Sequence, residues 1–211
     1  HFHGYDWPKS YSRIELMGPR GLRDERGQPY REALTAGLTY SGGGGHRIAP
    51  MTDAYRSTVI KLNEWLHNQL ATQSKSFHIT SLQLNRNWAT PLHVDSNNKG
   101  PSAILGLGIY TGGRFWVQDR DGIDPITVES ANDKYPQLVK DATLLGCFLD
   151  ARHNLQFFDG RHFHCTEDFR GERIIAISYC NYAAHSTPLP LLLDLRAYGF
   201  NPPPTTELDI Y

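Results

Sequence analysis

The chain has 211 residues, 20% of them charged, and a formal net charge of −1 at pH 7. This length fits one domain with a sizeable core, and the near-neutral charge gives no general attraction to nucleic acids or membranes. A polyanionic partner would need a local basic patch. The arginine-rich stretch at 20–31 is a candidate, but acidic residues are interleaved with its arginines, which favours a solvated mixed-charge loop.

Three cysteines are present and widely spaced, at positions 147, 165 and 180. An odd, scattered set fits neither a disulfide framework nor a zinc-binding motif, so we expect reduced thiols and an intracellular protein. No apolar run approaches the length of a membrane-spanning helix, and no signal-peptide pattern opens the chain. The sequence therefore predicts no membrane partner.

Residues 1–50 are rich in Gly, Pro, Arg and Tyr, which predicts an irregular N-terminal extension. Four consecutive glycines, Gly42 to Gly45, are not preceded by an expected strand and are not followed by the Lys-Ser/Thr of a phosphate-binding loop. We therefore interpret them as a flexible loop.

Residues 51–75 predict a supporting helix that packs against a sheet, with Thr52 or Asp53 as its N-cap. We expect His67, on this helix, to be structural rather than catalytic. Apolar residues recur at spacings of three and four and form one stripe: Tyr55, Val59, Leu62, Leu66 and Leu70.

From Phe77 onwards the apolar period changes from 3.6 to 2. Short segments rich in Ile, Leu and aromatic residues predict strands at 77–85, 103–110, 113–119, 142–150, 154–160, 162–166 and 172–180. A helix followed by seven or eight short strands predicts an α+β domain built on a β-sandwich or barrel, of which a jelly roll is one form, with its core at 77–182. Residues 186–211 predict a C-terminal helix, ended by Gly199, and a proline-rich tail.

The segment "LNRNWATPLHVDS", residues 84–96, places His93 and Asp95 just after a strand-like run. Residues two apart in an extended segment point to the same face, so this pair could bind a metal ion. A His-x-Asp pair also arises by chance in a chain with 10 histidines, so a metal site requires a third ligand.

The segment "FDGRHFHCTEDFRGERIIAISY", residues 158–179, offers His162 and His164 on one face of an expected strand. Arg173 opens the apolar run that follows, where an arginine is costly unless it meets an anion, such as a carboxylate bound through two parallel hydrogen bonds. With His93 and Asp95, His164 would complete two imidazoles and one carboxylate, the ligand set of non-haem Fe(II) oxygenases. Zinc could use the same ligands, but Arg173 favours iron with a 2-oxo acid.

These segments resemble the 2-oxoglutarate- and Fe(II)-dependent dioxygenases, whose pattern is His-x-Asp, a distal His and then Arg or Lys about ten residues later. The Asn-x-Asn before the first motif, the "TGGRFWV" hairpin and the ending "LLLDLRAYGFNPPP" resemble the TET/JBP-like branch and its algal and dinoflagellate relatives. The resemblance covers about residues 77–200. It implies an α+β fold with a double-stranded β-helix (jelly roll) core flanked by helices, and one oxygenase domain over 1–211.

Carried over residue by residue, the resemblance implies Fe(II) ligation by His93, Asp95 and His164, with His164 preferred to His162. Arg173 would hold the distal carboxylate of 2-oxoglutarate, and O2 would be consumed with it. One algal relative leaves ascorbate as an alternative cosubstrate. Further polar residues would line the cosubstrate or substrate pocket: Asn85, Asn87, Ser102 and Tyr179.

The resemblance implies oxidation of a modified base in DNA, such as 5-methylcytosine or thymine, and then a nuclear protein. A flipped base would stack on Trp88, Tyr110 or Trp116, and Arg86 and Arg114 would contact phosphates. Cys165, the acidic segment 166–172 and the absence of a basic surface depart from that expectation. A protein side chain or a small molecule therefore stays open as the substrate, as does a non-catalytic jelly-roll binding module.

Overall fold

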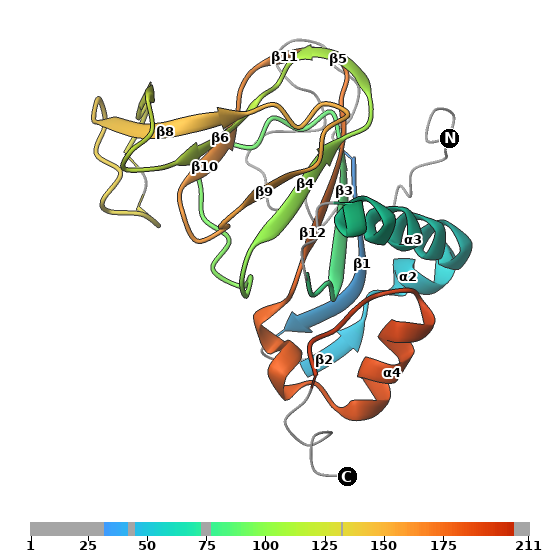
Figure 1. Ribbon diagram of the computed structural model, residues 1–211. Helices are drawn as coiled ribbons and strands as arrows, with labels where there is room; N and C mark the ends of the chain where they lie inside the picture. The colour runs from blue at the N-terminus through green and yellow to red at the C-terminus, as the bar shows by residue number, and fades with distance from the viewer. Residues whose placement is uncertain (1–31, 42–44, 73–76, 132, 205–211) are drawn as a thin grey trace.

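The structure, a computed structural model, describes residues 32–41, 45–72, 77–131 and 133–204 (Figure 1). The arginine-rich stretch at 20–31 and three of the four consecutive glycines lie outside the described residues. Two antiparallel sheets and a two-stranded ribbon form the body of the described part, and helices lie on one side of it (Figure 1).

The larger sheet has six strands in the order β2-β1-β3-β12-β4-β9. Every pair of neighbours in it is antiparallel. In that order, the strands are Gly45–Ile48, Glu32–Ser41, Ser81–Arg86, Ile174–Tyr179, Ser102–Gly106 and Gln156–Phe158.

The smaller sheet has four strands in the order β10-β6-β8-β7. In that order they are His164–Thr166, Phe115–Gln118, Thr143–Leu149 and Asp124–Thr127. The ribbon pairs β5 (Ile109–Gly112) with β11 (Phe169–Glu172).

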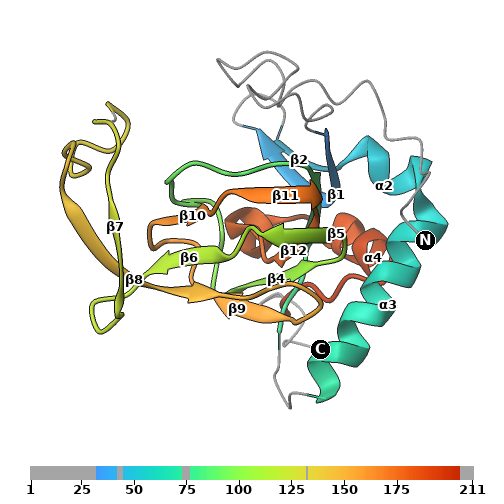
Figure 2. The same ribbon diagram turned by 90° about the horizontal axis from the view of Figure 1, so that it is seen from above.

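The connections between these strands are those of a jelly roll. From β3 the chain crosses to the smaller sheet at His93, which bridges to His164, and returns to the larger sheet as β4. It crosses again for β6, β7 and β8, returns as β9, crosses for β10, and ends as β12 between β3 and β4. Figure 2 shows β7 and β8 at the end of the molecule away from α3. The expected α+β fold with a jelly-roll core is confirmed.

The helices cover the outer face of the larger sheet (Figure 1). They are α2 (Pro50–Ala54), α3 (Arg56–Thr72), the 3-10 helix η1 (Tyr182–Ser186) and α4 (Leu189–Ala197). The apolar stripe expected on the first long helix is confirmed, because its last four members are buried and Tyr55 is half-buried. The C-terminal helix α4 ends just before Gly199, as expected, and that glycine adopts φ +80°.

The expected N-cap was wrong. Thr52 and Asp53 lie inside α2, whose N-cap is Ala49, and Pro50 begins the helix. The two side chains serve tertiary contacts instead: the Thr52 hydroxyl accepts a hydrogen bond from the Gly37 N–H at 2.8 Å, and Asp53 accepts one from the Tyr198 hydroxyl at 2.6 Å. A proline at the first helical position has no N–H to satisfy, which reduces the need for a cap.

The expectation that residues 1–50 form an irregular extension was wrong for the described part of that segment. Residues 32–41 and 45–48 form β1 and β2, which extend the larger sheet beyond β3. Alternate residues Leu34, Ala36 and Leu38 are buried beneath the helices. Ala and Gly are weak strand formers, so these residues become a strand through pairing with β3 rather than through propensity.

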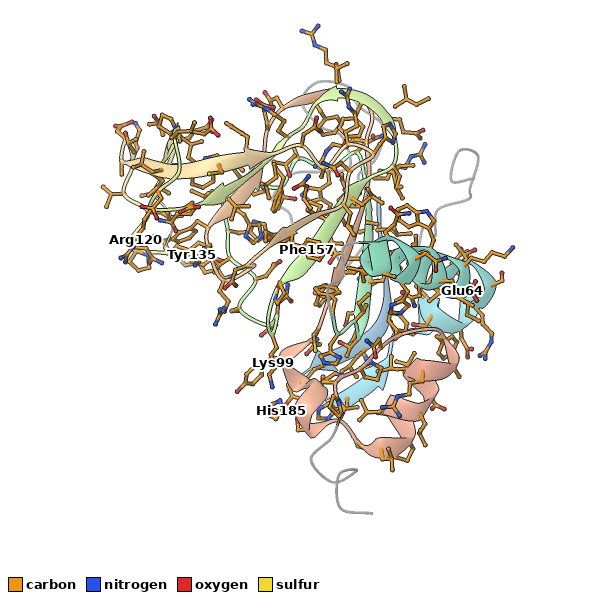
Figure 3. All side chains as sticks on the ribbon, viewed as in Figure 1. Glu64, Lys99, Arg120, Tyr135, Phe157 and His185 are labelled. Atoms are coloured by element: carbon orange, nitrogen blue, oxygen red, sulfur yellow. The ribbon has the colours of Figure 1, made fainter. Side chains whose placement is uncertain are left out.

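The space between the two sheets holds the site. Its apolar lining includes Ile104, Phe115, Val117, Phe158 and Ile175. A second apolar cluster, which contains Trp116, Tyr135 and Phe163, covers the outer face of the smaller sheet. Tyr135 of this cluster is labelled in Figure 3. Cross-strand partners share a face, so the register of each pair decides which side chains enter the space between the sheets.

Candidate metal centre and cosubstrate pocket

Two backbone hydrogen bonds bring the expected ligands together. The His93 N–H donates to the His164 carbonyl at 3.0 Å, and the His164 N–H donates to the His93 carbonyl at 2.9 Å. The Asp95 N–H donates to the Gly160 carbonyl at 2.7 Å. The segment 93–95 therefore runs beside β10 as an extra, irregular strand of the smaller sheet.

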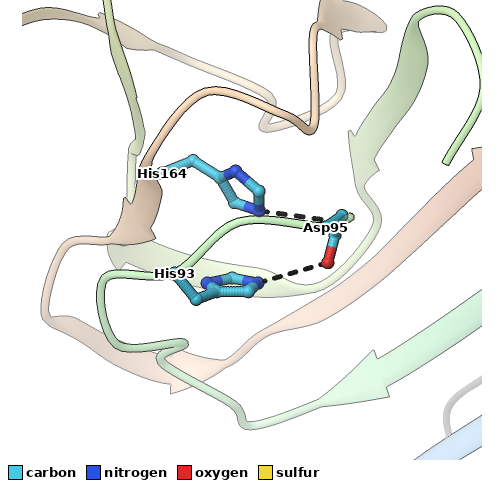
Figure 4. A group of neighbouring side chains, drawn as sticks. All are labelled: His93, Asp95 and His164. Atoms are coloured by element: carbon cyan, nitrogen blue, oxygen red, sulfur yellow. Dashed lines mark ion pairs between the residues drawn. The ribbon is translucent and has the colours of Figure 1, made fainter. Parts of the chain in front are cut away.

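The side chains of His93, Asp95 and His164 converge on one point (Figure 4). His93 Nε2 lies 3.5 Å from Asp95 Oδ1, and His164 Nε2 lies 3.6 Å from Asp95 Oδ2. One ligand atom from each residue lies within 4.8 Å of the others. Within the described ranges, no other group of three His, Cys, Asp or Glu side chains has such an arrangement.

The Nδ1 atom of each imidazole lies within hydrogen-bond distance of a backbone carbonyl. His93 Nδ1 lies 2.8 Å from the Pro91 carbonyl oxygen, and His164 Nδ1 lies 2.8 Å from the His162 carbonyl oxygen. A carbonyl can only accept, so Nδ1 is the donor in each ring, and Nε2 is the atom that faces Asp95. This is the arrangement of histidines that bind a metal through Nε2, and the His162 carbonyl, rather than its exposed side chain, contributes to it.

Asp95 is an anion at neutral pH. Its burial raises its pKa, but hydrogen bonds and charge attraction from His164 and His93 outweigh burial and hold the pKa of Asp95 well below its usual range. Two imidazole nitrogens and one carboxylate oxygen on one side of an ion fit Fe(II), and leave coordination positions open on the other side.

Asn98, to which no role at the site was assigned above, orients Asp95. Its buried amide nitrogen donates to Asp95 Oδ2 at 3.3 Å and to the Ser102 hydroxyl at 3.2 Å. Ser102 is fully buried on β4, so its contact is with Asn98. Gly160 packs on the same group, because a Cβ there would lie 3.1 Å from Asp95 Cβ and 3.3 Å from Asn98 Nδ2. The spacing of Asn98, three residues after Asp95, was the available signal.

Arg173 is 3% exposed. It immediately precedes β12, and its position in the strand alternation places it on the same face as Ile175 and Ile177, which looks into the space between the sheets. Its Nη1 donates to the Trp88 carbonyl at 3.0 Å, whereas its buried Nε and Nη2 have no hydrogen-bond partner within the described part of the chain. Burial lowers the pKa of Arg173 to about 10, so it remains a cation at neutral pH. A buried cation with two unused donors fits an anionic ligand.

Aromatic rings flank the Arg173 guanidinium. Its Cζ lies 5.6 Å from the ring centroids of Tyr110 and Phe169. Gly113, at φ +69°, is needed beside it, because a Cβ there would lie 2.9 Å from Arg173 Nε. The hairpin expected at "TGG" was wrong, because β5 pairs with β11 whereas β6 pairs with β10 and β8. The turn carries the chain from the ribbon to the smaller sheet and makes room for the guanidinium.

The other expected pocket residues lie on the inner strands. Asn85 is buried opposite Ile175 and accepts a hydrogen bond from Gln83 Nε2 at 2.9 Å. Tyr179, at the other end of β12, is half-buried, and burial together with the negative charge of Asp95 raises its pKa to about 12. Asn87 is buried, but its amide oxygen accepts from the Arg173 N–H, so this atom serves Arg173 rather than a ligand.

Three residues expected to contact DNA, one at the base and two at phosphates, have other partners. Trp116 is fully buried on the outer face of the smaller sheet, where its Nε1 donates to the Asp124 carbonyl at 2.9 Å, so its expected stacking role was wrong. Arg86 pairs with Glu172 at 2.8 Å, and Arg114 pairs with Glu167 at 2.9 Å. Phosphate contacts by these arginines would have to compete with the carboxylates.

No family model and no curated protein sequence matches the chain. A 2OG-Fe(II) oxygenase family oxidoreductase from Burkholderia pseudomallei is similar at 14% identity and a TM-score of 0.45, over 80% of this chain and 76% of that one. NgTET1, solved in complex with 5mC DNA, is similar at 13% identity and a TM-score of 0.46, over 82% and 68% of the two chains. Similarity this low does not decide the activity, which has to be inferred from the site residues. None of the described helices has the length and apolar character to cross a membrane.

Proposed function

We propose that the chain is a dioxygenase that uses Fe(II), O2 and 2-oxoglutarate to oxidise a C–H bond of its substrate. Two features together support this proposal. His93, Asp95 and His164 converge on one point, and Arg173 is buried with two donors, Nε and Nη2, that have no partner among the described residues. A structural metal site would have no need of a buried guanidinium, and a structural arginine would have its donors satisfied.

His93 and His164 would hold the iron through Nε2, and Asp95 would hold it through a carboxylate oxygen. When bound, iron and 2-oxoglutarate supply the oxidation, in which O2 is reduced and the 2-oxo acid is decarboxylated to succinate. Arg173 would bind the distal carboxylate and so fix the direction in which the 2-oxo acid enters the pocket. The apolar side chains of Phe115, Phe158 and Ile175 would keep bulk water from this space.

The first test is metal-dependent binding of 2-oxoglutarate, measured by calorimetry with Mn(II) in place of iron. We expect 2-oxoglutarate to bind in the presence of the metal, and Asp95→Ala to abolish this binding. Release of succinate under air with Fe(II) would then show turnover. A native chain that binds Mn(II) but does not bind 2-oxoglutarate would contradict the proposed cosubstrate, and ascorbate would be tested next.

For the substrate, we propose a modified base in DNA, the expectation that follows from the motif resemblance. Tyr110 supports it, because its ring lies beside Arg173 and would stack on a flipped base. The test is oxidation of 5-methylcytosine or thymine in an oligonucleotide, followed by mass spectrometry. The product base should appear only when Fe(II) and 2-oxoglutarate are both present.

One observation favours the alternative, a protein side chain or a small molecule. Both arginines expected at phosphates are already paired with glutamates, so a phosphate would have to displace a carboxylate from each of them. If Arg86→Ala and Arg114→Ala weaken DNA binding and reduce its salt dependence, the nucleobase proposal gains support. Turnover of 2-oxoglutarate with another substrate, and no DNA binding at any salt concentration, would favour the alternative.

A further inference from the structure

The chain leaves the larger sheet at Asn87, immediately after β3. This residue is 3% exposed and adopts φ +54°, a left-handed conformation that asparagine tolerates better than most residues other than glycine. The last regular pair of the β3–β12 ladder is Arg86 with Ile174, so the next pair would have joined Asn87 to Arg173.

Asn87 completes that pair in an unusual way. Its N–H donates to the Arg173 carbonyl at 2.7 Å, as in a regular ladder. The return bond, however, runs from the Arg173 N–H to the side-chain Oδ1 of Asn87, at 3.0 Å. The side chain replaces the backbone carbonyl as the acceptor, and so the backbone is free to turn away from the sheet.

That turn presents the next carbonyl to the guanidinium. The Trp88 carbonyl accepts a hydrogen bond from Arg173 Nη1 at 3.0 Å. Nε and Nη2, which have no partner among the described residues, form the opposite edge of the same planar group. This edge can take a carboxylate through two parallel hydrogen bonds, so the contacts of Asn87 and Trp88 orient the guanidinium for that purpose.

We propose that Asn87 is a positioning residue for the cosubstrate: it holds both the backbone and the guanidinium of Arg173, and thereby sets the affinity of the pocket for an acid with a second, distal carboxylate. This inference rests on the proposed function, since the dicarboxylate is 2-oxoglutarate. It replaces the expectation that the Asn87 amide oxygen lines the pocket.

The test compares two 2-oxo acids, 2-oxoglutarate and pyruvate, by calorimetry with Mn(II) in the full chain. Both acids can chelate the metal, but only 2-oxoglutarate has the distal carboxylate that Arg173 would bind. Asn87→Gly keeps a residue that accepts positive φ and removes the acceptor. We expect it to weaken 2-oxoglutarate binding about tenfold, the loss of roughly one good hydrogen bond's free energy, with pyruvate binding unchanged.

Three companion variants separate positioning from folding. Asn87→Asp keeps an acceptor for the Arg173 N–H and should stay within about threefold of the native affinity for 2-oxoglutarate. Asp141→Gly, at a second residue with positive φ (+65°) on the exposed surface, should change neither affinity. In the Arg173→Lys background, Asn87→Gly should cause little further loss, because the contact that it supports is already gone.

The outcomes are distinguishable. Equal losses for both acids in Asn87→Gly, or native affinity for 2-oxoglutarate in that variant, would overturn the role of Asn87 and leave the proposed function standing. If Asn87→Gly does not fold, a tenfold loss in Asn87→Asp would likewise overturn it, and native-like affinity there would support it. A native chain that binds neither acid would overturn the proposed function, and the role of Asn87 with it.

Discussion

His93 and His164 donate backbone hydrogen bonds to each other, at 3.0 and 2.9 Å, although they lie on distant parts of the chain. This reciprocal bridge sets the ring centroids 4.2 Å apart and points both Nε2 atoms at Asp95. The metal site therefore depends on the pairing of the segment 93–95 with β10. Any change that weakens this pairing should weaken metal binding without removing a ligand.

The ligand assignment predicts a sharp difference between two nearby histidines. His164→Ala removes an expected ligand and should weaken Mn(II) binding by roughly a hundredfold or more, whereas His162→Ala should have little effect, because only the His162 carbonyl is used. Calorimetry on the two variants measures both affinities. A large loss in His162→Ala with a small loss in His164→Ala would reverse the assignment.

Asn98 should affect the metal through Asp95. Asn98→Ala removes the donor that restrains the Asp95 carboxylate, and we expect metal affinity to fall about tenfold to a hundredfold. The neighbouring Asn97 is exposed and contributes its backbone carbonyl to Tyr182, so Asn97→Ala is the matched control. Equal metal affinity in the two variants would show that Asn98 does not orient the ligand.

Binding of 2-oxoglutarate should require the shape of the Arg173 guanidinium as well as its charge. Arg173→Lys replaces a planar fork with a single ammonium group, and 2-oxoglutarate should bind at least about tenfold more weakly. Arg170→Lys, at an exposed position on β11, is the control and should bind normally. Unchanged affinity in Arg173→Lys, measured by calorimetry, would assign Arg173 a structural role.

The thiol of Cys165 should react slowly with alkylating reagents. Burial, followed by the negative charge of Glu129, raises its pKa to about 11 from an ordinary value of 9.0. Because the reactive thiolate forms only as the pH rises towards that pKa, its fraction near neutral pH falls by about a hundredfold. Iodoacetamide labelling followed by mass spectrometry should show this, and labelling as fast as that of a free cysteine peptide would contradict the burial of Cys165.

The packing of α4 predicts that two adjacent leucines contribute very different amounts to the free energy of unfolding. Leu192 is 0% exposed and Leu193 is 51% exposed. Leu192→Ala should lower the free energy of unfolding by about 2–5 kcal/mol, and Leu193→Ala by less than about 1 kcal/mol. Urea unfolding of the two variants measures the difference. Similar losses would mean that α4 does not pack on the sheet through the side that contains Leu192.

The sequence alone determined the features that depend on residue type and local period. The stripe on α3, most core strands and the ending at Gly199 could be predicted, because each reflects a spacing of apolar residues or a residue with special backbone freedom. The identities of His93, Asp95, His164 and Arg173 followed from the chemistry that a buried cation and a His-x-Asp pair require.

Tertiary structure decided the features that depend on strand pairing. The segment of β1 is weak in strand propensity and becomes a strand because β3 offers it an edge. Whether Trp116 faces the site or the outer cluster depends on a register that a one-residue shift would invert. Asn87 meets the Arg173 N–H only after β3 and β12 have paired, and the two residues are too far apart in sequence for a local pattern to specify the contact. Asn98 lies close in sequence to Asp95 and Ser102, but its contacts with them are set by the folded chain rather than by a regular element.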